Sequence, residues 1–152
     1  MKTQKIDAFS VIGIAVQTTN ENGQAGIDIP LLWSKFMSEG IVEKIPNKID
    51  TTLHCMYTDY EKDHTKPYTT ILGCKVAHLE TIPEGMTGKT IKAGNYIRFA
   101  VKGNLQQGAV FKTWQKIWDT PIARTYTADF EVYGEKAQNP ESAELDIFIA
   151  VK

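Results

Sequence analysis

The sequence predicts an α+β fold built from two βαββ halves in tandem, related by a pseudo-twofold axis and enclosing a central cavity. Three observations predict it. The order strand, helix, strand, strand occurs twice along the chain, and the helix of each half carries tryptophan. The tyrosines of the two third elements, Tyr57 and Tyr133, lie half the length of the 152-residue chain apart. We therefore expect a single domain over residues 1–152, with one half at about 5–80 and the other at about 88–152.

The first half begins with a strand followed by a helix. Residues Phe9–Thr19 are rich in Val, Ile and Thr and lack helix formers, which indicates a strand. After a polar turn, Asp28 can cap a helix, Pro30 suits its first turn and Gly40 can end it in the left-handed conformation. Helical spacing places one apolar stripe on this helix, formed by Ile29, Leu32, Trp33, Phe36 and Met37.

Two strands complete the first half. They are expected at Thr51–Thr58 and Tyr68–Leu79, joined by a polar hairpin loop at Asp59–Pro67. The loop is rich in charge, so we expect Asp63 and His64 within it to be solvated. A link that contains Gly and Pro leads to the second half.

The second half repeats the same order. A strand at Ala93–Gly103 is followed by Asn104 and Gln107, whose spacing is that of a capping box. Two further strands are expected at Asp129–Gly134 and Glu144–Val151. A helix is expected after the capping box and before these two strands, and it ends before Pro121. One apolar stripe on this helix is formed by Val110, Trp114, Ile117 and Trp118.

The composition restricts the class of protein. With 42% hydrophobic and 23% charged residues the chain is an ordinary globular one. Its 17 basic and 18 acidic residues are dispersed and only two are arginines, so we expect no direct nucleic-acid partner. There is no apolar run that could span a membrane and no signal peptide, which favours a cytoplasmic protein without a membrane partner. The two cysteines are expected to be reduced and buried.

Alternation along the seventh predicted element singles out one carboxylate. Glu131 and Tyr133 share one face of this strand, whereas Phe130 and Val132 share the other. We expect the apolar pair to face the helix that carries Trp114, and Glu131 to point toward the cavity.

The matching tyrosines make the two halves chemically unequal. Aligning Tyr57 with Tyr133 places Cys55 at the position equivalent to Glu131, so one half offers a carboxylate where the other offers a thiol. Such asymmetry in a cavity indicates a functional site. The alternative is that Glu131 lies on a solvated face of the sheet, where strand glutamates are common.

Four segments together carry a resemblance to a known family. They are Leu32–Phe36 (LWSKF), Lys92–Gly103 (KAGNYIRFAVKG), the helix with Trp114 and Trp118, and Asp129–Tyr133 (DFEVY). In this order and spacing they resemble the GyrI-like small-molecule-binding family, which is similar to the effector-binding domain of AraC-type and multidrug-responsive transcription regulators. Unlike those regulators, this chain shows no helix-turn-helix pattern, so we expect no direct gene regulation by the chain itself.

The resemblance implies a tandem βαββ fold with a central ligand cavity and a buried glutamate that meets cationic, often aromatic, ligands. Glu131 is the residue at the matching position. The candidate aromatic wall around it consists of Trp33, Tyr57, Tyr96 and Tyr133, since aromatic faces attract cations. Trp33 also fits a core position, and Trp114 and Trp118 are assigned to the core.

Three functions follow from this site. The first is a stand-alone sensor or sequestering domain for hydrophobic, cationic or aromatic small molecules, with a lipophilic cation as its partner. The second is a hydrolase of reactive small molecules that uses Glu131 as general acid or base. The third is an inhibitory protein-interaction module. The sequence does not decide whether the chain forms a homodimer through a sheet edge.

No motif supports a metal or a cofactor. Cys74 and His78 share a strand face near His54, but no zinc-binding spacing accompanies them. Neither cysteine lies where its pKa would be lowered, so a Cys–His nucleophile is not expected. Nucleotide-binding glycine motifs are absent from the sequence.

Overall fold

A computed structural model describes residues 2–152 and confirms the α+β class. Eleven helices and strands carry the fold, connected by loops and short 3-10 turns. In chain order they are β1 (Gln4–Ile6), β2 (Phe9–Thr18), α1 (Ala25–Ser38), α2 (Ile41–Lys44), β3 (Lys48–Thr58), β4 (Tyr68–Val76), β5 (Thr87–Ile91), β6 (Gly94–Gly103), α3 (Ala109–Asp119), β7 (Ala128–Tyr133) and β8 (Ala143–Val151).

All the strands belong to one antiparallel sheet, in the order β1-β6-β8-β7-β3-β4-β2-β5. The arrangement β6-β8-β7 on one side of the centre corresponds to β2-β4-β3 on the other, which is the pseudo-twofold that the sequence predicts. The halves meet through hydrogen bonds between β3 and β7, where Cys55 pairs with Glu131. The two halves therefore form one continuous sheet rather than two sheets that abut, and the edge strands β1 and β5 were not expected.

Local signals in the sequence are confirmed in part. Gly40 adopts the left-handed conformation at φ 60°, as expected for the end of the first helix. The Asn104 side chain accepts a hydrogen bond from the Gln106 amide, but it caps a 3-10 turn, and α3 begins only after Gly108 at φ 80°. Asp28 lies inside α1, where it accepts a hydrogen bond from the Thr18 hydroxyl instead of capping the helix.

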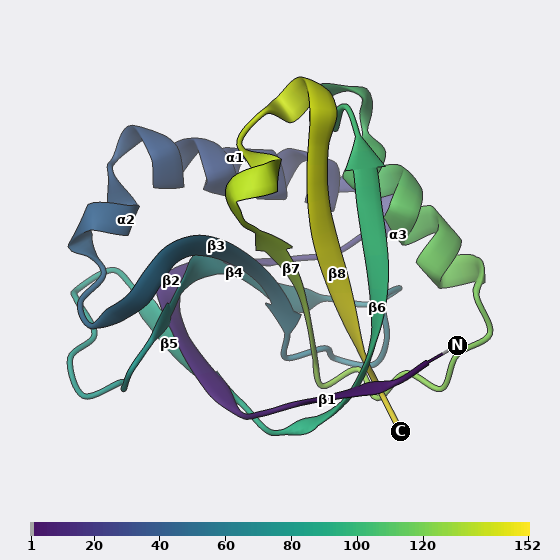
Figure 1. Cartoon of the computed structure of the whole chain (residues 1–152), viewed down its shortest axis with the longest axis horizontal. Coiled ribbons are helices and arrows are strands. Elements are labelled where there is room, and N and C mark those ends of the chain that lie inside the picture. Colours follow the sequence, from purple (N-terminus) through teal and green to yellow (C-terminus); the bar gives the residue numbers. More distant parts are fainter. Residues whose placement is uncertain (1) are drawn as a thin grey trace.

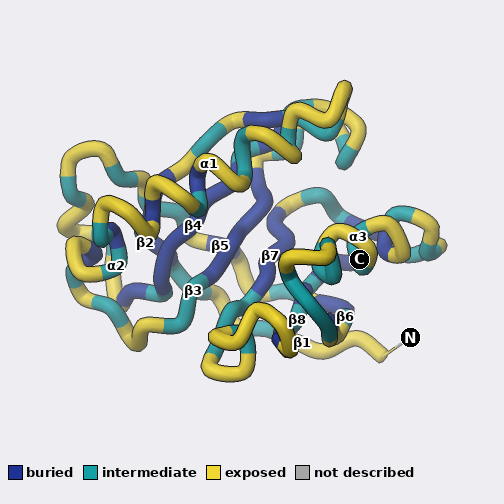
Figure 2. Tube along the Cα trace, turned by 90° about the horizontal axis from the view of Figure 1, so that it is seen from above, coloured by how far each residue is buried: buried dark blue, intermediate teal, exposed yellow. Residues whose placement is uncertain are grey.

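The sheet is strongly curled, and both long helices cover the same face of it (Figure 1). Seen from above, α1 and α3 have exposed outer surfaces, and beneath them β4, β7 and the C-terminal half of β3 are largely buried (Figure 2). Leu32 and Phe36 of α1 pack on β2, β3 and β4, and Ile117 of α3 packs on β6 and β8. Each helix thus covers the strands of its own half.

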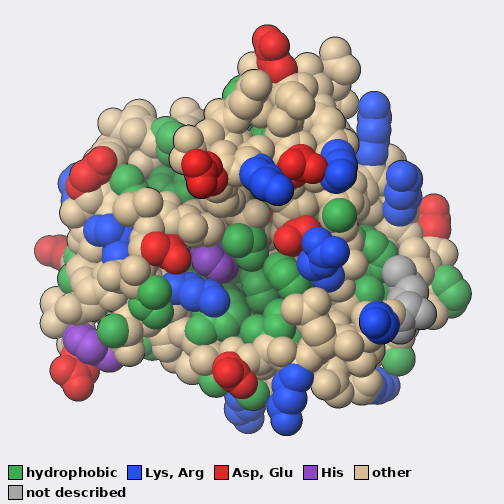
Figure 3. Space-filling model, viewed as in Figure 1, with side chains coloured by type: hydrophobic (Ala, Val, Ile, Leu, Met, Phe, Trp, Pro, Cys, Tyr) green, Lys and Arg blue, Asp and Glu red, His purple; other side chains and the backbone are tan. Residues whose placement is uncertain are grey.

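The opposite face of the sheet has its own apolar cluster. Phe130 of β7 packs there with Val11 of β2 and Tyr96 of β6, strands that stand far apart in the sheet order and meet because the sheet curls. The hollow in this face, with apolar side chains at its centre, is visible in Figure 3. The expectation that Phe130 and Val132 face the helix carrying Trp114 is therefore wrong.

A pair of glycines accompanies the close approach of β2 and β4. Gly13 of β2 pairs with Gly73 of β4. A Cβ on Gly13 would lie 2.0 Å from the carbonyl oxygen of Leu72, and one on Gly73 would lie 2.1 Å from that of Ile12. Only glycine at both positions allows these two neighbouring backbones to lie this close together.

The structure also bears on the expectations about the cysteines and about membrane-spanning segments. Cys55 and Cys74 are both free and buried. Across residues 2–152 no helix combines the length and apolarity that a membrane crossing requires.

Candidate functional site

A cavity of about 1110 Å³ lies between the two helices and the sheet. Both halves line it: Trp33 of α1 and Tyr57 of β3 from the first, Trp114 of α3 and Glu131 of β7 from the second. Its size is slightly above the range usual for small-molecule pockets, and its position between halves is a common one for them. The central cavity predicted from the sequence is confirmed.

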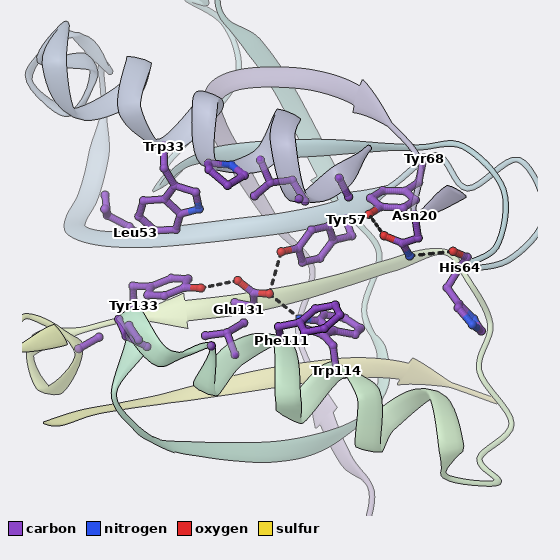
Figure 4. A pocket seen from close by; sticks show the side chains of 18 of the residues that line it. Asn20, Trp33, Leu53, Tyr57, His64, Tyr68, Phe111, Trp114, Glu131 and Tyr133 are labelled. Carbon is purple, nitrogen blue, oxygen red and sulfur yellow. Dashed lines mark hydrogen bonds between the residues drawn. The ribbon is translucent and has the colours of Figure 1, made fainter. Parts of the chain in front are cut away.

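Glu131 lies at the centre of this cavity, with only 1% of its surface exposed. Its Oε2 accepts hydrogen bonds from the Tyr57 hydroxyl at 2.7 Å and from Trp114 Nε1 at 2.6 Å. Its Oε1 accepts one from the Tyr133 hydroxyl at 2.5 Å. These donors come from β3, α3 and β7, so three elements hold the carboxylate in one position (Figure 4). The alternative of a solvated glutamate is wrong.

Burial dominates the electrostatics of this carboxylate. Loss of water raises the pKa of Glu131 above its ordinary value, and the hydrogen bonds from Tyr133, Trp114 and Tyr57 lower it only in part. Burial likewise raises the pKa of the Tyr57 and Tyr133 hydroxyls well above the usual range, with Glu131 adding to the effect. Both phenols therefore stay protonated donors to the carboxylate.

Cys55 completes the central group without becoming reactive. Its sulfur lies 3.4 Å from the Tyr57 hydroxyl, on the strand position paired with Glu131. Burial, followed by the charge of Glu131, raises the pKa of the Cys55 thiol well above its ordinary value. Because the thiolate is the nucleophilic form, this arrangement does not favour a cysteine nucleophile.

The raised pKa of Glu131 predicts a pH dependence of stability. Below the ordinary value of 4.5 the group is protonated in the folded and unfolded states alike. As pH rises from there through the folded-state pKa, the unfolded chain binds fewer protons, so the folded chain without ligand loses stability. Urea unfolding across this range should show the Glu131→Gln variant gaining stability relative to the natural chain as pH rises. A difference that stays constant with pH would contradict the assignment.

Aromatic rings flank the carboxylate on both sides. The ring of Trp33 meets that of Tyr133 edge-on at 4.8 Å, and Tyr57 meets Trp114 edge-on at 5.3 Å. Figure 4 shows the four rings around Glu131, Trp33 and Tyr57 from one half and Trp114 and Tyr133 from the other. Three of the four predicted wall residues, Trp33, Tyr57 and Tyr133, thus line the cavity.

Tyr96 is not part of this wall, which corrects the prediction. It is 3% exposed and packs against Phe130 at 5.4 Å, in the cluster on the opposite face of the sheet. Strand alternation had left the choice of face open, and β6 places Tyr96 on the face away from the helices. The ring has no access to the cavity.

Two tryptophans assigned to the core from their helical stripe are cavity residues. Trp114 binds Glu131, and Trp118 stacks on His64 at 5.3 Å with an interplanar angle of 9°. The stripe predicts which side of α3 faces inward, but a core and a cavity wall have the same periodicity. Only the indole N–H of Trp114, which needs an acceptor when buried, could have signalled the contact.

His64 lies at one end of the cavity, whereas the sequence predicts it in solvent. The loop between β3 and β4 returns over this end because Asn20 donates a hydrogen bond to the His64 carbonyl at 2.8 Å and accepts one from the Tyr68 hydroxyl at 2.7 Å. Burial, then the charge of Arg124, lowers the pKa of the His64 ring. His64 of this loop therefore lines the cavity.

A buried ion pair near the same end was not predicted at all. Arg124 Nη2 lies 2.8 Å from Asp129 Oδ2, with side chains 4% and 0% exposed. The same oxygen accepts from the Tyr60 hydroxyl at 2.6 Å, and Asp129 Oδ1 accepts from the Ala150 amide at 2.8 Å. The Arg124 guanidinium also lies 4.3 Å from the Tyr126 ring centre. Arg124 lines the cavity as well.

No three His, Cys, Asp or Glu side chains within residues 2–152 are grouped so that they could hold a metal ion. His54 instead packs against Phe9 and Phe130 on the far face of the sheet.

Comparisons with known proteins agree with this architecture. A family described as Cass2, integron-associated effector binding protein, matches residues 3–151. The Bacillus subtilis (strain 168) protein YobU, named as a candidate transcriptional regulator, is 27% identical over 127 residues, which cover 82% of this chain and 79% of YobU.

Solved structures show the same fold. The integron cassette protein VCH_CASS2 from the mobile metagenome of Vibrio cholerae has a TM-score of 0.76 and 28% identity, over 99% of this chain and 95% of that one. The protein SAV2435, solved bound to tetraphenylphosphonium, has a TM-score of 0.81 and 16% identity, over 99% and 93%. The C-terminal domain of EcmrR has a TM-score of 0.59 and 15% identity, over 99% and 96%.

Proposed function

Because the chain belongs to the family of integron-associated effector-binding proteins, we propose that it binds a lipophilic, aromatic cation in its central cavity. The observation that carries the proposal is a glutamate, Glu131, buried within an aromatic-lined cavity and raised in pKa by loss of water. No cationic side chain hydrogen-bonds to this carboxylate within residues 2–152; its donors are two phenols and an indole.

The physical reason is charge compensation. A buried carboxylate with only neutral donors is costly to keep ionised, and a cation that enters the cavity offsets that cost. Rings that face the cation add attraction, on the order of 2 kcal/mol when water is excluded. Trp33, Tyr57, Trp114 and Tyr133 are positioned to do so.

A relative of the same fold supports the choice of ligand class. SAV2435 has been solved with tetraphenylphosphonium, a cation whose surface consists of aromatic rings. Its identity to this chain is low, so the likeness concerns the fold, and the ligand comes to this chain as a proposal. The role of sensor or sequestering domain and the cytoplasmic location remain predictions of the same kind.

The geometry of the site supports hydrolysis less well than it supports cation binding. A general acid or base must reach a proton of the substrate, but both oxygens of Glu131 already accept hydrogen bonds from fixed donors. The nearest nucleophile, Cys55, has a raised pKa. The arrangement suits charge recognition better than turnover. The inhibitory interaction module and the homodimer gain no support from the cavity.

Tetraphenylphosphonium should raise the melting temperature of the chain in a saturable way. A ligand at one hundred times its dissociation constant adds about 2.7 kcal/mol to stability. Tetraphenylborate, which has the same shape and the opposite charge, is the matched control and should give no shift. Equal shifts with both ions would contradict charge recognition. Release of product from ester substrates, abolished in Glu131→Gln, would establish the hydrolase instead.

A further inference from the structure

The cavity has a second polar centre, separate from Glu131. The indole of Trp114 contacts both: its Nε1 donates to Glu131, and the Arg124 guanidinium carbon lies over its ring, 5.9 Å from the ring centre. Both Glu131 and Arg124 line the cavity. A ligand in the cavity beside this indole therefore has two polar groups near it.

Arg124 has hydrogen-bonding capacity that the protein does not use. Its Nη2 is bound to Asp129, but Nε and Nη1 are buried and have no hydrogen-bond partner within residues 2–152. The side chain is 4% exposed. Buried donors normally find a partner, so two unpaired ones on a residue that lines the cavity indicate a place for an acceptor.

His64 belongs to the same centre. Its ring and the Arg124 guanidinium both lie against Tyr126, at 6.5 Å and 4.3 Å from the ring centre. Its Nδ1 is likewise buried without a partner among the described residues. Figure 4 shows His64, Asn20 and Tyr68 gathered at one end of the cavity, with Trp33 and Leu53 at the other. One end of the cavity is thus polar and the other apolar.

The charge at this end selects the kind of acceptor. Asp129 already neutralises Arg124 through a bond of 2.8 Å, so no excess positive charge is left for an anion. The N–H groups that remain suit an uncharged oxygen with free lone pairs.

We propose that Arg124, with His64 beside it, forms a second subsite that accepts an uncharged oxygen of the ligand. The ligand is then a lipophilic cation that also carries a carbonyl or ether oxygen, placed at the Arg124 end of the cavity. This inference rests on the proposed function, since the cationic part of the same ligand occupies the Glu131 site.

Two probes of nearly equal shape test the proposal. They are (4-acetylbenzyl)triphenylphosphonium and (4-isopropylbenzyl)triphenylphosphonium, which differ in a carbonyl group against a CH–CH3 unit. Calorimetric titration should give about tenfold tighter binding of the acetyl probe, as expected for one hydrogen bond to a charged donor. This comparison uses the natural chain and depends on no variant.

Arg124→Lys keeps a positive charge next to Asp129 but removes the unpaired Nε and Nη1. The preference for the acetyl probe should fall below twofold in this variant. Arg98→Lys is the matched control, because Arg98 pairs with Asp146 at 2.9 Å on the surface and does not line the cavity, and it should keep the tenfold preference.

The outcomes separate the two proposals. Equal affinity of both probes for the natural chain, or a preference that persists in Arg124→Lys, would overturn the second subsite and leave the cation site standing. Failure of both probes to bind would overturn the cation site and the second subsite together.

Discussion

The Glu131→Gln variant is expected to bind tetraphenylphosphonium about a hundredfold more weakly than the natural chain. Removing one member of a buried charge pair costs 2–5 kcal/mol of binding free energy, and each 1.4 kcal/mol is about tenfold. Glutamine keeps the size of the side chain and one oxygen acceptor for the donors around it. The change therefore removes the charge and replaces one of the two acceptor oxygens with an N–H2 group. Isothermal titration at neutral pH measures the effect.

Two controls show whether a loss of affinity comes from the cavity charge. Without ligand, Glu131→Gln should melt no lower than the natural chain, because it removes a carboxylate that burial disfavours. Glu84→Gln changes an exposed glutamate outside the cavity and should leave binding unchanged. Undiminished affinity in Glu131→Gln would mean that the cation binds elsewhere.

Replacing Arg124 with methionine is expected to lower the free energy of unfolding by about 3–5 kcal/mol. The reason is that the substitution leaves the buried Asp129 carboxylate without its positively charged partner. Asp129 is 0% exposed, and its Oδ2 would lose its cationic partner while remaining in the interior. Urea unfolding, with ΔG extrapolated to water, measures the loss.

The double variant Arg124→Met with Asp129→Asn should recover most of that stability. Asparagine can still accept from the Ala150 amide and meet the Tyr60 hydroxyl, but it carries no charge that needs a partner. The recovery distinguishes a stranded charge from lost packing. If the double variant is as unstable as Arg124→Met, packing of the arginine against Tyr126 accounts for the effect instead.

The course of the chain could be predicted because it depends on local signals. Alternation, turn residues and helical stripes marked most of the elements, and the tyrosines Tyr57 and Tyr133 marked the repeat. They also made Cys55 the equivalent of Glu131 in the other half, and the structure pairs these two residues where β3 meets β7. The short edge strands β1 and β5 were not predicted, because their sequences show no clear alternation of apolar and polar residues.

Which face of the sheet holds the cavity could not be read from the pattern. Alternation separates Phe130 from Glu131 but does not say which of them lies under the helices, and for Phe130 and Tyr96 the expectation was wrong. The face is decided by long-range contacts, here the curl that brings β2 and β6 together. A carboxylate and two phenols clustered on one strand pair were the more reliable guide.

The polar end of the cavity was missed for a related reason. Arg124 and Asp129 are close in sequence, but nothing in the sequence indicates that both are buried. His64 sits in a charge-rich loop whose position at the end of the cavity depends on Asn20, which is distant in the chain and hydrogen-bonds to both His64 and Tyr68. Such contacts arise from tertiary structure alone.

The most direct test of the account is a crystal structure of the chain with tetraphenylphosphonium. We expect the phosphorus in the cavity between α1 and α3, with its phenyl rings against Trp33, Tyr133 and Trp114 and with the Glu131 carboxylate as the nearest charge. Electron density for the cation in the hollow on the opposite face, or on the surface with the cavity unchanged, would contradict the account.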